Sequence, residues 1–130
     1  MLFATMLGVT PARAGAAGSA MIERTVFLDP YAPSGSTATV ERDIYLAKGT
    51  YSWNIAFFEA DEVSPLGYRA RNIFIAAGTY HWSASFIKAP DPHAYTIISV
   101  LQKDNNPASI SAYVGITVSA DYRIRSIINN

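Results

Sequence analysis

Two segments of the chain decide its fold: "RDIYLAKGTYSWNIAFF" at residues 42–58 and "RNIFIAAGTYHWSASFI" at residues 71–87. They start 29 positions apart and carry Arg, Ile, Gly, Tyr, Trp and Phe at corresponding places. Each segment has an apolar run, a Gly-Thr-Tyr sequence and a second run in which apolar and polar residues alternate, which predicts a strand, a turn and a strand. Because two copies are too few for a solenoid, we interpret the pair as an internally duplicated strand–turn–strand unit.

A glycine stands at the same place in both copies, Gly49 and Gly78, between the two expected strands. A tight turn there favours a residue that adopts positive φ without steric cost, and glycine does so because it has no Cβ. We therefore predict that Gly49 and Gly78 are turn residues.

Alternation sorts the side chains of the second strand of each copy onto two faces. The aromatic face is predicted to point into the core, with Tyr51, Trp53, Tyr80 and Trp82. The opposite face is polar and carries Ser52, Asn54, His81, Ser83 and Ser85. This polar row is either an ordinary solvent-exposed sheet face or a shallow ligand-binding face, and the sequence leaves both interpretations open.

From Met21 onward, segments rich in Pro, Gly and Asn divide the chain into short runs of β-branched and aromatic residues. The predicted strands are residues 21–28, 38–46, 50–58, 68–75, 79–87, 94–102, 109–119 and 122–128. Eight short strands with frequent turns are typical of an all-β protein, so we predict an antiparallel, jelly-roll-like β-sandwich. A chain of this length forms one domain, which we place at residues 21–130.

The N-terminal stretch "MLFATMLGVTPARA" (1–14) has an apolar run followed by Ala12-Arg13-Ala14, the small-residue pattern that precedes a signal-peptidase cut. We therefore expect residues 1–20 to be the remnant of a signal peptide, and the protein to be secreted or extracytoplasmic. The alternative is a disordered arm, since "GAAGSA" (15–20) has no apolar pattern that could pack. No later apolar stretch reaches the roughly 18–20 residues that a membrane-spanning helix needs.

The charge and cysteine content exclude several functional classes. Ten Lys and Arg balance ten Asp and Glu, and no long run of one sign occurs, so we expect no nucleic-acid partner. The absence of cysteine excludes disulfides, thiolate chemistry and Cys-based zinc sites. Charged residues make up 15% of the chain, below the roughly 25% of an average soluble domain, so the surface depends on uncharged polar side chains.

We find no pattern of catalytic residues, and therefore expect a protein that is not an enzyme. The chain has two histidines and no G-x-S-x-G sequence. His93 follows "APDP" in an expected loop and is a weak candidate for ligand binding. Carboxylates that cluster in expected loops are weak candidates for a structural calcium site: Glu59, Asp61, Glu62 and Asp104.

The strings "IYLAKGTYSW" (44–53) and "IFIAAGTYHW" (73–82) resemble a strand–turn–strand element of jelly-roll carbohydrate-binding modules and related secreted β-sandwiches. The resemblance implies a sandwich fold. It also implies that sugars stack on aromatic side chains in loops or on a sheet face, and that a structural calcium ion is often held. No residue of this chain matches a diagnostic ligand pattern of those modules, so no residue role follows from the resemblance.

Three functional hypotheses follow. The first is a secreted, non-catalytic β-sandwich that binds carbohydrate or the cell-envelope surface. The second is a structural or assembly subunit of a surface layer, filament or shell, which would form a homo-oligomer. The third is a small exported enzyme or enzyme inhibitor, for which the sequence offers a composition but no site.

Overall fold

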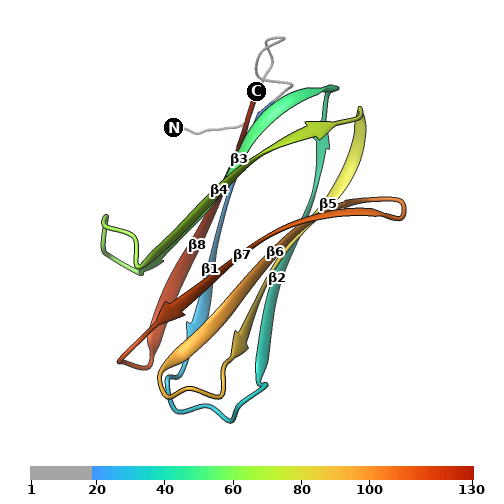
Figure 1. The fold of residues 1–130 in the computed structure, drawn as a ribbon. Coiled ribbons are helices and arrows are strands. Elements are labelled where there is room, and N and C mark those ends of the chain that lie inside the picture. Colours follow the sequence, from blue (N-terminus) through green and yellow to red (C-terminus); the bar gives the residue numbers. More distant parts are fainter. Residues whose placement is uncertain (1–18) are drawn as a thin grey trace.

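The structure, a computed structural model, describes residues 19–130 and is all-β (Figure 1). The expected arm at residues 1–20 lies almost entirely outside the described residues. The strands are β1 (Ala20–Leu28), β2 (Thr37–Leu46), β3 (Gly49–Glu59), β4 (Gly67–Ile75), β5 (Gly78–Lys88), β6 (Ala94–Lys103), β7 (Asn106–Gly115) and β8 (Ala120–Asn129). None of the described residues belongs to a helix long and apolar enough to span a membrane.

The strands form two antiparallel sheets of four, in agreement with the predicted antiparallel sandwich of eight strands. Sheet A has the order β1-β8-β3-β4 and sheet B the order β2-β5-β6-β7. Figure 1 shows the two sheets as separate layers, with the β3–β4 loop projecting at the left. The fold class is therefore confirmed as a two-sheet, all-β architecture, and its jelly-roll character stays a prediction.

The two similar segments each cross from one sheet to the other. Segment 42–58 leaves sheet B with β2 and enters sheet A with β3, whereas segment 71–87 leaves sheet A with β4 and enters sheet B with β5. The register gives corresponding residues corresponding partners, because Arg42 pairs with Trp82 and Arg71 pairs with Trp53. Neither segment is a hairpin within one sheet.

The tyrosine of each Gly-Thr-Tyr sequence forms a hydrogen bond with the segment that connects the two sheets. Tyr51 donates its hydroxyl hydrogen to the Ala47 carbonyl (2.6 Å), and Tyr80 donates to the Ala76 carbonyl (2.8 Å). Tyr122 makes the same bond to the carbonyl four residues before it, after the crossing from β7 in sheet B to β8 in sheet A. A buried tyrosine that bonds to a nearby backbone carbonyl rigidifies such corners in β-sandwiches.

Only one of the two turn glycines has positive φ. Gly78 has a φ of 153°, a backbone angle that residues with a Cβ rarely adopt. Gly49 does not have positive φ, and the prediction for it is wrong in this respect. In both segments the chain turns at the two residues before the glycine, so Gly49 and Gly78 are the first residues of β3 and β5. At Gly49 the absence of a Cβ instead leaves room for the side chain of Asn130.

The core lies between the sheets and contains both tryptophans, each fully buried. Phe57 of β3 packs on Phe86 of β5 across the interface, with ring centroids 6.0 Å apart, and stacks on Tyr122 of β8. Tyr51 and Tyr80 are also buried. The aromatic face of each segment therefore faces the interior, and neither tryptophan ring is available to a ligand.

The seventh strand starts three residues earlier than predicted, and residues 116–119 are not strand. A two-residue turn joins β6 to β7, with Asp104 at a φ of 55°. Pro107 lies within β7, where we expected a loop, because β7 is an edge strand and its outer side needs no hydrogen-bond donor.

Each of the four edge strands carries a residue that hinders pairing with another chain. Arg24, Arg42 and Arg71 lie opposite the buried residues Ile124, Trp82 and Trp53, so they are on the inner faces of β1, β2 and β4. Arg71 also donates to the backbone carbonyl of Ser109 in β7 (3.0 Å). Inward-pointing charges and an edge proline are devices by which β-proteins avoid edge-to-edge association.

Candidate functional site

The predicted polar row does not form one surface. Because the two segments enter opposite sheets, Ser52 and Asn54 lie on the outer face of sheet A, whereas His81, Ser83 and Ser85 lie on the outer face of sheet B. The core separates the two groups. Each outer face must therefore be considered separately.

The outer face of sheet A contains a continuous uncharged surface on β3 and β4, which we call the β3–β4 face. The register pairs Thr50 with Phe74, Ser52 with Asn72, Asn54 with Ala70 and Ala56 with Tyr68. Paired residues of neighbouring strands point to the same side of a sheet. The β3–β4 face therefore consists of Thr50, Ser52, Asn54, Ala56, Tyr68, Ala70, Asn72 and Phe74.

Two exposed aromatic side chains mark the ends of this face. Tyr68 is 56% exposed and Phe74 is 65% exposed. Both belong to β4, and six residues at the rise of an antiparallel strand place their Cα atoms about 20 Å apart. Each exposed aromatic ring offers an apolar face, with a hydroxyl group at its edge in Tyr68, against which a ligand can pack.

The floor between the two rings is polar and small. Its centre consists of Ser52, Asn72 and Asn54. The short side chains of Ala70 and Ala56 beside them do not project above this centre. Within residues 19–130, no hydrogen bond engages the side chains of Ser52, Asn54 or Asn72. Their hydroxyl and amide groups can therefore donate to, and accept from, a ligand.

On sheet B, His81 lies between two carboxylates. Its Nδ1 is 2.7 Å from Asp43 Oδ1, and its Nε2 is 2.7 Å from Glu41 Oε1. A neutral imidazole has one N–H and can donate to only one of them, so both contacts are hydrogen bonds only when the ring is protonated. The hydrogen bond to Asp43, and next the one to Glu41, raises the pKa of His81 above its ordinary value of 6.5.

This cluster makes stability depend on pH. Because the folded-state pKa of His81 is raised, its contribution is fully present below pH 6.5 and is lost as the pH rises through the folded-state pKa. We expect the melting temperature to fall over that interval and His81→Gln to remove this part of the dependence. The ring titration, followed by NMR, should move to lower pH in Asp43→Asn; an unchanged titration in that variant would contradict the assignment.

His93 belongs to the loop between β5 and β6, and this loop is at the lower end of the sandwich in Figure 1. Its ring meets the exposed ring of Tyr31 edge-on, with centroids 5.1 Å apart. Its backbone, at a φ of 62°, accepts a hydrogen bond from the amide of Ile116. Asp91, two residues before His93, accepts the hydroxyl hydrogen of Tyr113 (2.6 Å). The two contacts of His93 connect the β5–β6 loop with the β1–β2 loop and with the connection between β7 and β8.

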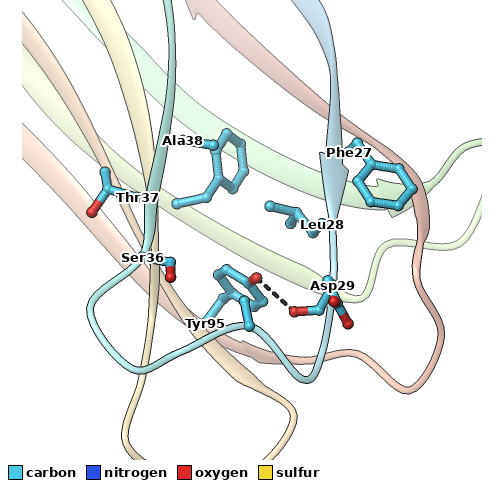
Figure 2. Close-up of a pocket in the computed structure, with 9 residues that line it drawn as sticks. Phe27, Leu28, Asp29, Ser36, Thr37, Ala38 and Tyr95 are labelled. Carbon is cyan, nitrogen blue, oxygen red and sulfur yellow. Dashed lines mark hydrogen bonds between the residues drawn. The ribbon is translucent and has the colours of Figure 1, made fainter.

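A small hollow lies beside these loops, between the end of β1 and the start of β2 (Figure 2). Its volume is about 180 Å³ and its walls are mainly apolar, including Phe27, Leu28 and Ala38. Tyr95 donates its hydroxyl hydrogen to the Asp29 carbonyl at the base (2.8 Å). The hollow is smaller than the roughly 300 Å³ at which ligand pockets begin, so it has little room for a ligand.

The carboxylates considered for calcium do not come together. Glu59, Asp61 and Glu62 lie at one end of β3, whereas Asp104 follows Lys103, whose side chain covers Gly78 near the other end. Among residues 19–130 no three His, Cys, Asp or Glu side chains are placed to hold a metal ion. The Arg123 guanidinium already binds two carbonyls of the β3–β4 loop, those of Ala60 and Glu62. Calcium stays a prediction from the sequence.

Sequence reasoning missed half of the β3–β4 face. Alternation in "GYRARNIFI" (67–75) puts Tyr68, Ala70, Asn72 and Phe74 on one side of β4, so the signal was present. The other side carries Arg69 and Arg71. From the sequence alone, two charged residues on one side of a strand predict that this side faces solvent. Because β4 is an edge strand, these arginines reach water from the inner face, and the aromatic side faces outward.

No family model, no curated protein and no solved structure matches the chain. The functional interpretation therefore depends on the surface chemistry described above.

Proposed function

We propose that the protein is a secreted, non-catalytic β-sandwich that binds an extended polysaccharide of the cell envelope or its surroundings on the β3–β4 face. The observation that carries the proposal is the placement of Tyr68 and Phe74 at the two ends of an uncharged floor of hydroxyl and amide groups. Export is part of the proposal and rests on the pattern in residues 1–14.

The chemistry of the face suits a sugar chain. Aromatic rings pack against the apolar C–H faces of sugar rings, and amides and hydroxyls match sugar hydroxyls as both donors and acceptors. The centre of a protein–protein interface is apolar and excludes water. The centre of the β3–β4 face is instead formed by Ser52, Asn54 and Asn72, which favours a hydrated, hydroxyl-rich ligand.

The edges of the sheets argue against assembly by strand addition. β1, β2 and β4 carry inward-pointing arginines, and β7 carries Pro107. A filament or shell built by edge pairing would need at least one unobstructed edge. This favours the binding module over the alternative of an assembly subunit.

The proposal is tested by incubating the purified full chain with insoluble polysaccharides and with bacterial cell walls, with and without a calcium chelator. We expect retention on at least one of these materials and a monomer in size-exclusion chromatography. Passage through all of them, together with a stable oligomer that buries Tyr68, would overturn the proposal in favour of assembly. Release by the chelator would add calcium to the site.

A further inference from the structure

A cation without an anionic partner lies next to the β3–β4 face. Arg125 of β8 pairs with Ala56 of β3, which pairs with Tyr68 of β4. All three point outward, and two interstrand spacings place Arg125 and Tyr68 about 10 Å apart. Arg125 is therefore within reach of a ligand that stacks on Tyr68.

The guanidinium of Arg125 is held in place by Phe58. Its Cζ lies 4.9 Å from the centroid of that ring, and Arg123 covers the same ring at 4.5 Å. Phe58 is buried although it is on the outer side of the sheet, because these two arginines cover it. Stacking on an aromatic ring keeps a guanidinium planar and oriented, which prepares it for a planar anion.

The carboxylate that faces Arg125 is occupied elsewhere. Glu23 of β1 pairs with Arg125 in the register, but its Oε2 accepts a hydrogen bond from Arg123 at 2.7 Å. Asp121, the other acidic residue on the outward side of the strands of sheet A, lies four residues along β8 from Arg125, about 13 Å away. Residues 1–18 contain no Asp or Glu that could supply the missing charge.

Within residues 19–130, Arg125 has neither a salt bridge nor a side-chain hydrogen bond, and its Nε is buried without a partner. A partly buried cation loses hydration, and this loss is normally offset by a paired anion. Arg123 covers the same ring and differs from Arg125 in its hydrogen bonds. All three of its guanidinium nitrogens donate to oxygens of the protein.

We infer that Arg125 binds the carboxylate of an acidic polysaccharide, whose sugar rings stack on Tyr68 and continue along the β3–β4 face. This inference rests on the proposed function and adds the charge of the ligand to it. A carboxylate is planar and accepts two parallel N–H bonds from one guanidinium, which a neutral sugar hydroxyl does not. Uronic-acid polymers are the class of polysaccharide with this chemistry.

The test uses the full chain and affinity gel electrophoresis with polygalacturonate, alginate and hyaluronan, each beside its carboxyl-reduced, neutral form. We expect wild type to bind at least one acidic polymer about tenfold more tightly than the reduced form. Arg125→Gln should bind both forms equally, and Tyr68→Ala should weaken binding of both. Arg42→Gln, an exposed arginine on the edge strand of the other sheet, is the control for loss of one positive charge and should keep the preference.

The outcomes separate the two proposals. Equal binding of the acidic and reduced forms by wild type would overturn the role of Arg125 and leave the polysaccharide site intact. A preference that persists in Arg125→Gln would also overturn it. Binding of none of the polymers would overturn the acidic-ligand inference, and the pull-down on neutral polysaccharides and cell walls would then decide the proposed function by itself. Circular dichroism melting of each variant checks that it is folded.

Discussion

Trp53→Ala is expected to lower the free energy of unfolding by about 3–5 kcal/mol, because the side chain is fully buried at the centre of the core. Its indole Nε1–H donates to Ser126 Oγ at 3.1 Å, and Ser126 in turn donates to the Asn54 carbonyl. The substitution leaves a large cavity and removes this bond. For a domain of this size the melting temperature should fall by more than about 10 °C, measurable by circular dichroism or calorimetry.

Trp82 provides a matched comparison, because it is equally buried and occupies the corresponding place in sheet B, but its Nε1–H has no partner. An unsatisfied buried donor costs stability. Phe keeps most of the ring volume and removes the N–H group, so Trp82→Phe should be less destabilising than Trp53→Phe by about 1 kcal/mol. Equal effects of the two Phe variants would show that the bond to Ser126 does not contribute to stability.

Truncation of the two exposed aromatic side chains should abolish most of the polysaccharide binding. Tyr68→Ala and Phe74→Ala are each expected to weaken binding roughly tenfold, as is usual for an aromatic residue that carries an interface. The two residues are too far apart to couple directly, so the effects should add in free energy to roughly a hundredfold loss in the double variant. The measurement is affinity electrophoresis on a polymer that retains the wild type.

Tyr45→Ala is the control, since Tyr45 is a tyrosine of similar exposure (61%) on an edge strand of the opposite sheet. It should leave both binding and melting unchanged. If Tyr45→Ala weakened binding as much as Tyr68→Ala, the loss would not be specific to the β3–β4 face, and the proposed site would be wrong. If all three variants bound like wild type, the aromatic rings would have no part in recognition.

The sequence by itself determined the secondary structure and the interior of the protein. Strand alternation placed Trp53, Trp82, Tyr51 and Tyr80 on one side of their strands, and all four are buried. This inference is reliable because side chains in a strand alternate with a period of two, whatever the strand's neighbours are. Turn residues likewise marked every strand end to within four residues, because Gly, Pro and Asn favour particular backbone conformations through local interactions alone.

Only the tertiary structure decided which strands are neighbours. The strand neighbours in turn decide which residues form the candidate site. The sequence shows that Ser52 and His81 are polar residues at corresponding positions, yet the crossings at residues 47–48 and 76–77 put them on opposite faces of the sandwich. Tyr68, Phe74 and Arg125 form one surface because β4, β3 and β8 are adjacent in sheet A, although more than 50 residues separate Phe74 from Arg125. Strand order arises from long-range pairing between segments whose local patterns are alike, so no local signal in the chain specifies it.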